Sequence, residues 1–281
     1  MRVGRIPYLN CAPVYGAVDR GLVTLDADLI TGIPSALNRG VAEGTIDVSV
    51  VSAVEYARDA GKYLLLPDLA ISCHGEVRSV MLFSTRPATE LGGTQVLVSR
   101  SSMTSVALLD LLFEHVWKVR PTFVPGDAEA DDLRQDQSPV AARLVIGDAA
   151  LMLRHKEHPV AVAHGREYPF VYDLGLEWKR WTGLPFVFAV WVARREVNVR
   201  DALQVHGALM ESRNWGLANL SRISDEASAV CRLPSAVIHE YLAGLDYRLG
   251  LEYLEGLSEF FRRLELAGKV PQGRLVFLPA A

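Results

Sequence analysis

The sequence predicts an α/β protein with two lobes. Strand-like and helix-like segments alternate along the first third of the chain, and a second alternating set follows the polar stretch at 85–93, which is rich in proline and glycine. An apolar segment at 184–193 then precedes a region that is almost wholly helical. Such alternation is typical of a sheet covered by helices on both faces. We expect one lobe at 1–87 and 186–281, a second at 88–185, and an interlobe cleft where the strands end.

The composition argues against several classes of protein. The 281 residues are 50% hydrophobic, and the net charge of -4 predicts no general attraction to nucleic acid or an acidic membrane. No apolar run approaches the roughly 20 residues that span a bilayer, and the start "MRVGRIPYLN" lacks the apolar core of a secretory signal. Three scattered cysteines, Cys11, Cys73 and Cys231, form neither a disulfide framework nor a metal knuckle. We therefore expect a cytoplasmic protein.

The first lobe is predicted from local patterns. Pro34 suits the first turn of a helix that Gly44 would end, and Ser52 suits the N-cap of another helix. The expected strands are 3–8, 45–51, 63–67, 69–73 and 78–84, and the expected helices are 12–21, 34–44 and a segment that follows Ser52.

The second lobe and the tail follow the same reasoning. Expected strands are 94–99, 120–125, 142–147 and 170–175, and the strand 184–193 returns to the first lobe. Expected helices are 105–117, an acidic segment at 127–135, 148–155 and 176–183. The last helix, 250–268, places Leu251, Leu254, Leu257, Phe261 and Leu264 on one face.

Asn10 stands between the first strand and the helix that begins near Ala12. An asparagine there can cap the helix. Its amide can also face the cleft and bind a ligand oxygen. Both interpretations remain open at this stage.

The segment "SRSSMTSVALLDLL" is the strongest local signal. Ser101, Ser102, Thr104 and Ser105 crowd the start of a helix that needs only one capping hydroxyl. Helix N-termini leave about four N–H groups unpaired and attract anions. The cluster predicts a carboxylate or phosphate site, with a plain capped helix as the alternative. The chain lacks GxxxxGK[ST], and no GxGxxG follows a strand, which argues against a nucleotide.

Other candidates are weaker. Ser79 lies in an apolar strand after Gly75, and Thr182 and Gly183 precede the returning strand. Asp148 at a strand end is best interpreted as a helix cap. His155 and His158 have i, i+3 spacing, but no third metal ligand is evident. Because no nucleophile–base pair stands out, the sequence favours a site for a small anion, or an enzyme whose substrate brings its own reactive groups.

Six segments between about Val3 and Ala193 resemble the menaquinone biosynthesis protein A family, the chorismate dehydratases of the futalosine pathway. They are "GRIPYLNCAPVY", "DVSVVSAVEYAR", "YLLLPDLAISCHGEVRSVMLFS", "SRSSMTSVALLDLL", "IGDAAL" and "DLGLEWKRWTGLPFVFAVW". The resemblance implies a type II periplasmic-binding-protein-like fold in a cytoplasmic enzyme. It also implies conversion of chorismate to 3-[(1-carboxyvinyl)oxy]benzoate, with no metal or organic cofactor.

The resemblance assigns site residues by matching motifs. It implies catalytic roles for Asn10 of the "YLN" motif and for Ser79 of the G-x-V-x-S-V motif. The substrate-binding residues that it implies are Tyr8, Ser52, Gly75, Val77, Ser101, Ser102, Thr104, Ser105, Asp148, Thr182 and Gly183. Two alternatives stay open. One is a non-catalytic solute-binding protein for a small carboxylate. The other is the sister cyclase of the same pathway, which uses a histidine of its second lobe, here His155, His158 or His164.

Overall fold

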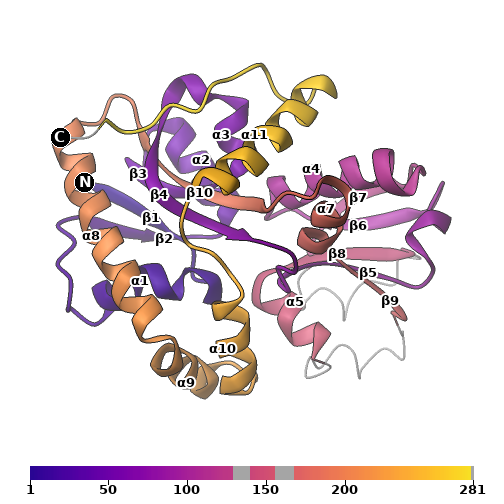
Figure 1. The fold of residues 1–281 in the computed structure, drawn as a ribbon, viewed down its shortest axis with the longest axis horizontal. Helices are drawn as coiled ribbons and strands as arrows, with labels where there is room; N and C mark the ends of the chain where they lie inside the picture. Colours follow the sequence, from indigo (N-terminus) through magenta and orange to yellow (C-terminus); the bar gives the residue numbers. More distant parts are fainter. Residues whose placement is uncertain (129–139, 156–167, 280–281) are drawn as a thin grey trace. The chain divides into compact units, whose positions relative to one another are not determined.

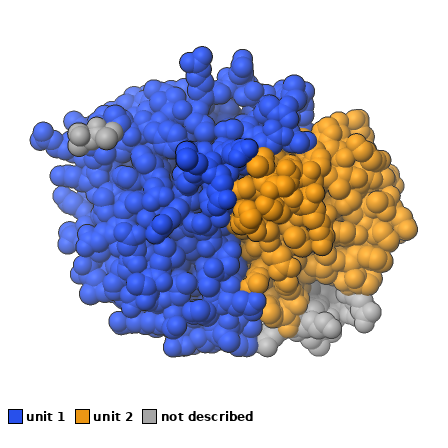
Figure 2. Space-filling view, viewed as in Figure 1, with its two compact units in different colours: residues 1–72, 187–281 blue, residues 73–186 orange. Residues whose placement is uncertain are grey.

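The described part of the chain forms two compact α/β units. The computed structural model describes residues 1–128, 140–155 and 168–279. Unit 1 comprises Met1–Ser72 and Val187–Ala281, and unit 2 comprises Cys73–Phe186 (Figure 2). Within the described residues, each unit contains a five-stranded sheet. The predicted two-lobed α/β class is therefore confirmed.

The first boundary between the units lies earlier than the sequence predicted. Strand β5 (Val80–Ser84) pairs with β8 (Ala142–Ile146) and with β9 (Phe170–Asp173) in the sheet of unit 2. The stretch 85–93, which we expected to join the lobes, therefore lies within unit 2. Proline and glycine mark tight connections inside a sheet as well as linkers, so composition alone could not separate the two cases.

Unit 1 is built on a sheet with the strand order β2-β1-β3-β10-β4 (Figure 1). Its strand β1 runs parallel to both β2 and β3, whereas β10 pairs with β3 in the antiparallel sense. The strands are β1 (Arg2–Arg5), β2 (Asp28–Thr31), β3 (Val48–Ser52), β4 (Tyr63–Cys73) and β10 (Phe186–Arg194).

The helices of unit 1 come from both ends of the chain. Two short 3₁₀ turns, η1 (Leu9–Cys11) and η2 (Ala60–Lys62), lie among them. The helices are α1 (Ala12–Asp19), α2 (Pro34–Glu43), α3 (Ala53–Arg58), α8 (Val199–Ala218), α9 (Leu220–Val230), α10 (Ser235–Ala243) and α11 (Leu251–Leu266). Figure 1 shows α1 on one face of the sheet and α2 with α3 on the other. This double cover explains why every residue of β3 is buried.

The turn signals in the sequence placed the first helices well. Helix α2 begins at Pro34 and ends against Gly44, whose φ of 80° is the left-handed conformation that glycine tolerates best. Ser52 caps α3, and its hydroxyl accepts a hydrogen bond from the Glu55 amide at 3.2 Å. Both predictions are confirmed.

Close packing of α8 fixes the first helix of the chain. A Cβ added to Gly216 of α8 would lie 2.0 Å from the carbonyl oxygen of Pro13, so only glycine fits there without a shift. The Ser212 hydroxyl of α8 also accepts a hydrogen bond from the Ala17 amide at 3.1 Å. The C-terminal region thus holds α1, and with it the η1 turn that precedes α1.

Unit 2 has the strand order β7-β6-β8-β5-β9. Strand β6 (Gln95–Ser99) runs parallel to β7 (Thr122–Gly126) and to β8, and β5 is antiparallel to both of its neighbours. The helical elements are η3 (Ala88–Glu90), α4 (Met103–Leu112), the π-helical turn η4 (Phe113–Trp117), α5 (Gly147–Arg154) and α7 (Leu174–Thr182). The acidic helix expected at 127–135 lies almost wholly outside the described residues.

The last helix buries a face that overlaps only partly with the predicted one. In α11 the buried residues are Tyr253, Gly256, Leu257, Phe260 and Leu264, whereas Leu251 is 87% exposed. The prediction placed Leu257 and Leu264 correctly but missed Tyr253, Gly256 and Phe260. Among the described residues, no helix is long and apolar enough to cross a membrane.

Candidate active site

Two of the predicted residues in unit 1 lie at the same edge of its sheet. Asn10 belongs to η1, which follows β1, and Ser52 is the last residue of β3. Because β1 and β3 are parallel neighbours, their carboxyl ends meet at one edge. Carboxyl ends of strands in open α/β sheets are the usual location of ligands.

Asn10 does not cap helix α1. The N-cap position is Cys11, and no side chain makes a capping hydrogen bond there. The Oδ1 atom of Asn10 is buried and accepts no hydrogen bond from any described residue. Buried polar side-chain atoms are rarely left unpaired, so this atom requires an explanation other than helix capping.

Ser52 and Tyr8 have structural contacts of their own. Besides capping α3, the Ser52 hydroxyl accepts a hydrogen bond from Nδ2 of Asn38 at 3.1 Å. Tyr8 precedes η1, and its carbonyl oxygen accepts from the Cys11 amide at 3.0 Å. The Ser52 hydroxyl therefore already serves the fold, which weakens the case for substrate binding by this residue.

The candidates of unit 2 gather at one edge of the second sheet. Ser99 ends β6, and Ile146 ends the parallel strand β8. Ser79 directly precedes β5, whose first residue Val80 pairs with Ile146. Asp173 ends β9 and pairs with Met81 near the start of β5. The topology thus brings Ser79, the Ser101–Ser105 turn and the start of α5 to a common edge.

The serine cluster at the start of α4 contains the helix cap and further hydroxyl groups beside it. Ser102 is the N-cap, and its hydroxyl accepts from the Ser105 amide at 3.2 Å and donates to the Ser105 hydroxyl at 2.7 Å. Ser101 is 9% exposed, and its amide donates to the Ser99 hydroxyl at 3.0 Å. Thr104 is buried in the first turn. One hydroxyl therefore caps the helix as expected, and the cluster offers more than capping needs.

The loop that carries Ser79 has an unusual backbone. Gly75 has a φ of 133° and Arg78 a φ of 63°, both in the region that side chains disfavour. Ser79 is 2% exposed, and among the described residues its hydroxyl donates only a long hydrogen bond of 3.4 Å, to the Val77 carbonyl oxygen. The described residues therefore engage the Ser79 hydroxyl only weakly.

Asp173 anchors this loop, and sequence reasoning missed it. The Val77 and Arg78 amides donate to the two carboxylate oxygens at 3.0 and 2.7 Å. Burial raises the pKa of Asp173, and the amide donors oppose that rise. The sequence held a usable signal, since an aspartate that precedes an amphipathic helical segment is a common N-cap.

Three other predictions have local explanations. Asp148 lies in the first turn of α5 and is not its cap, since the cap position is Ile146. This interpretation was therefore wrong, although a carboxylate in a first turn still suits the helix dipole. The Thr182 hydroxyl donates to the Trp178 carbonyl oxygen at 2.9 Å and accepts from the Leu184 amide at 3.1 Å. Gly183 ends α7 with a φ of 77°.

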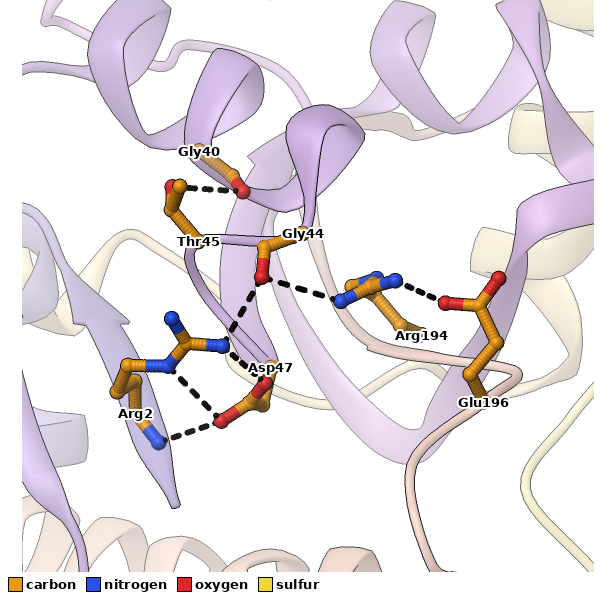
Figure 3. Close-up of polar contacts among 7 residues, drawn as sticks. All are labelled: Arg2, Gly40, Gly44, Thr45, Asp47, Arg194 and Glu196. Atoms are coloured by element: carbon orange, nitrogen blue, oxygen red, sulfur yellow. Dashed lines mark hydrogen bonds and ion pairs between the residues drawn. The ribbon is translucent and has the colours of Figure 1, made fainter.

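The charged network of unit 1 lies away from the candidate edge. Figure 3 shows Arg2 and Arg194 converging on the carbonyl oxygen of Gly44, at 2.9 and 3.2 Å, while Arg2 also pairs with Asp47. Arg2 begins β1, so these guanidinium groups stand at the opposite end of the strand from Asn10. They hold the end of α2 and do not supply a carboxylate site at the candidate edge.

A metal site finds no support in the described part of the chain. Within residues 1–128, 140–155 and 168–279, no group of three or more His, Cys, Asp or Glu side chains could hold an ion. His155 follows α5, whereas His158 and His164 lie outside the described residues. The Cys73 thiol is buried, which raises its pKa and disfavours the reactive thiolate.

Solved structures match the fold at low sequence identity. A protein of Archaeoglobus fulgidus matches with a TM-score of 0.73 and 20% identity, over 96% of this chain and 98% of the other. The periplasmic aliphatic sulphonate binding protein SsuA from Escherichia coli matches with a TM-score of 0.64 and 13% identity, over 98% of this chain and 95% of the other. These likenesses establish a periplasmic-binding-protein-like fold.

Sequence comparisons identify the family. A chorismate dehydratase of Thermus thermophilus is 32% identical over 266 residues, which are 92% of this chain and 93% of the relative. A 1,4-dihydroxy-6-naphtoate synthase of the same organism is 24% identical over 99% of each chain. The model of a family described as menaquinone biosynthesis matches residues 1–266. This chain therefore belongs to the menaquinone biosynthesis family.

Proposed function

We propose that this protein is a chorismate dehydratase, which converts chorismate to 3-[(1-carboxyvinyl)oxy]benzoate in the futalosine route to menaquinone. The family match over residues 1–266 supports it, as does the 32% identity to a chorismate dehydratase. The lower identity of 24% to the naphthoate synthase favours the dehydratase over the sister cyclase. We also propose that the enzyme works in the cytoplasm, which suits its three free cysteines.

The reaction needs little from the protein beyond binding and orientation. Chorismate loses the ring hydroxyl and the hydrogen on the adjacent ring carbon that bears the enolpyruvyl ether, and water leaves as the ring becomes aromatic. In this proposal the enolpyruvyl carboxylate takes that hydrogen as a proton and passes it to the departing hydroxyl, which leaves as water, so the substrate supplies its own base. The protein then has to hold two carboxylates and the leaving hydroxyl in a reactive arrangement.

The assignment of site residues rests mainly on the amide oxygen of Asn10. It is a buried acceptor to which no described residue donates, at the carboxyl edge of the unit 1 sheet. We propose that this oxygen contacts the leaving hydroxyl of chorismate. In unit 2, we propose that Ser79, whose hydrogen bond to Val77 is long, and the Ser101–Ser105 turn bind carboxylate groups through hydroxyl and amide donors.

The direct test is incubation of the purified protein with chorismate, followed by mass analysis of the products. A product lighter than chorismate by one water, with the absorbance of a substituted benzoate, supports the proposal. Binding of chorismate without turnover would identify a solute-binding protein instead. Inertness toward chorismate, with formation of 1,4-dihydroxy-6-naphthoate from the sister enzyme's substrate, would identify the cyclase.

A further inference from the structure

The loop of residues 74–79 joins β4 to β5 and carries three residues of the proposed site. They are Gly75, Val77 and Ser79. Its backbone includes a non-glycine residue at positive φ, Arg78, directly before Ser79. Such a conformation persists only where neighbouring groups enforce it. The position of the Ser79 hydroxyl therefore depends on what holds this loop.

The carboxylate of Asp173 holds the loop through the backbone. Its Oδ1 accepts from the Val77 amide at 3.0 Å, and its Oδ2 accepts from the Arg78 amide at 2.7 Å. The same Oδ1 accepts from the Leu176 amide at 3.1 Å, which makes Asp173 the N-cap of α7. Asp173 is 5% exposed, so water competes little for these hydrogen bonds. One buried side chain thus ties the loop to the first turn of a helix.

Two further contacts restrain the same loop. A Cβ added to Gly175 would lie 2.5 Å from the Gly75 carbonyl oxygen and 2.6 Å from Sγ of Cys73, so the first turn of α7 packs directly on the loop. On the other side of Arg78, the Ser79 carbonyl oxygen accepts from the Gly147 amide at 2.7 Å. Ser79 is therefore fixed from one side by the sheet and from the other by Asp173.

We propose that Asp173 is a positioning residue of this enzyme, which sets the Ser79 hydroxyl by binding the Val77 and Arg78 amides. This inference rests on the proposed function, because it assigns Ser79 to the substrate. Asp173 itself need not touch the substrate. Its contribution to catalysis therefore passes through Ser79, and this dependence separates it from a residue that only stabilises the fold.

The test uses Asp173→Ser, which keeps a helix cap but removes the carboxylate that binds the loop amides and pairs with Arg154 at 3.8 Å. A serine still caps α7, but its single short hydroxyl cannot bridge both loop amides. We expect kcat/KM for chorismate to fall by about tenfold or more, since small misplacements in an active site are costly. In a Ser79→Ala background, the same change should reduce kcat/KM by less than about twofold, because the two residues act as one unit.

Two control variants isolate this effect. Asn198→Ser exchanges another capping residue, whose Oδ1 accepts from the Arg200 amide at the start of α8, and should leave kcat/KM unchanged. Val96→Ala shortens a buried side chain in β6, which is separated from β5 by β8, and provides a variant of lowered stability. Any of three results would overturn the proposal. Asp173→Ser could retain wild-type kcat/KM, or its effect could add fully to that of Ser79→Ala. Alternatively, Val96→Ala could lower kcat/KM by as much as Asp173→Ser does.

A readout that does not depend on turnover completes the test. Hydrogen exchange of the Val77 and Arg78 amides should be faster in Asp173→Ser than in wild type and both controls. Unchanged exchange would overturn the positioning role. The wild-type protein could also be inactive toward chorismate while the Val77 and Arg78 amides still exchange faster in Asp173→Ser. That result would refute the proposed function but would support the role of Asp173 in holding the loop.

Discussion

Replacement of Asn10 tests whether the unpaired amide serves the substrate or the fold. The three changes to make are Asn10→Ala, Asn10→Ser and Asn10→Asp. The Oδ1 atom accepts no hydrogen bond from a described residue, so its loss breaks no protein hydrogen bond. An unsatisfied buried polar group costs about 1–3 kcal/mol, so Asn10→Ala should leave the free energy of unfolding unchanged or raise it. Loss of a real helix cap would instead lower it by about 1 kcal/mol.

Turnover should respond very differently from stability. Removal of one preorganised polar contact in an active site costs about 100-fold in kcat, so Asn10→Ala and Asn10→Ser should lose activity on that scale. Asn10→Asp should lose most, because a new negative charge would face the carboxylates of chorismate. The assay pairs the rate of chorismate consumption with the melting temperature of each variant. A fully active Asn10→Asp enzyme would falsify the substrate role and leave the buried oxygen without a function.

Three further predictions test the fold and the anion site. Gly216→Ala should lower stability by about 1–3 kcal/mol in thermal unfolding, because the new Cβ would meet the Pro13 carbonyl oxygen at 2.0 Å. In the control Gly207→Ala on the same helix, the new Cβ meets nothing within 4 Å, and stability should rise by about 0.5–1 kcal/mol. Equal effects of the two substitutions would refute this packing argument. The Arg2 guanidinium, bonded to Asp47 at 2.8 Å, holds the pKa of that carboxyl below its usual range, so the ion pair stabilises the fold above about pH 4 and is lost as pH falls further. Denaturant unfolding of Asp47→Asn should therefore show a small deficit at pH 7 that shrinks as the pH falls below about 4, and a deficit of undiminished size in acid would contradict the ion-pair explanation. Ser102→Ala with Thr104→Ala should weaken chorismate binding by about 1–3 kcal/mol in calorimetry, whereas a loss of about 1 kcal/mol in stability with unchanged affinity would reduce the cluster to a cap.

Local signals predicted elements more reliably than they predicted boundaries or roles. Pro34, Gly44 and Ser52 marked helix ends correctly because their conformational limits act within a few residues. The sequence prediction misplaced the first boundary between the units. Strand β5 belongs to the sheet of unit 2 because it pairs with β8 and β9, which lie more than fifty residues away on the chain. No property of the β5 sequence itself encodes that choice.

The candidate residues show the same limit. Resemblance selected Ser79, but the carboxylate that sets its loop is Asp173, and only the folded chain brings the two together. The capping prediction for Asp148 failed because the helix begins one residue earlier, at Gly147, whose φ of 64° only a folded backbone reveals. Sequence patterns report a residue's neighbours along the chain, whereas these roles depend on partners across the sheet.

The hydrogen bonds already made by each polar side chain indicate which candidates are free to meet a substrate. The Thr182 hydroxyl both donates and accepts within the end of α7, and the Ser52 hydroxyl is occupied by Asn38 and by the cap of α3. Substitution of either residue should therefore lower stability and affect turnover mainly through the fold. Within the described part of the chain, Asn10 has an acceptor without a donor, and Ser79 has only a long 3.4 Å contact. Their substitution should therefore affect turnover and leave folding largely intact. The Asp173 carboxylate accepts hydrogen bonds from three backbone amides, and we expect its effect on turnover to depend on the presence of Ser79. This is the pattern expected of a residue that positions a substrate-binding group without contacting the substrate.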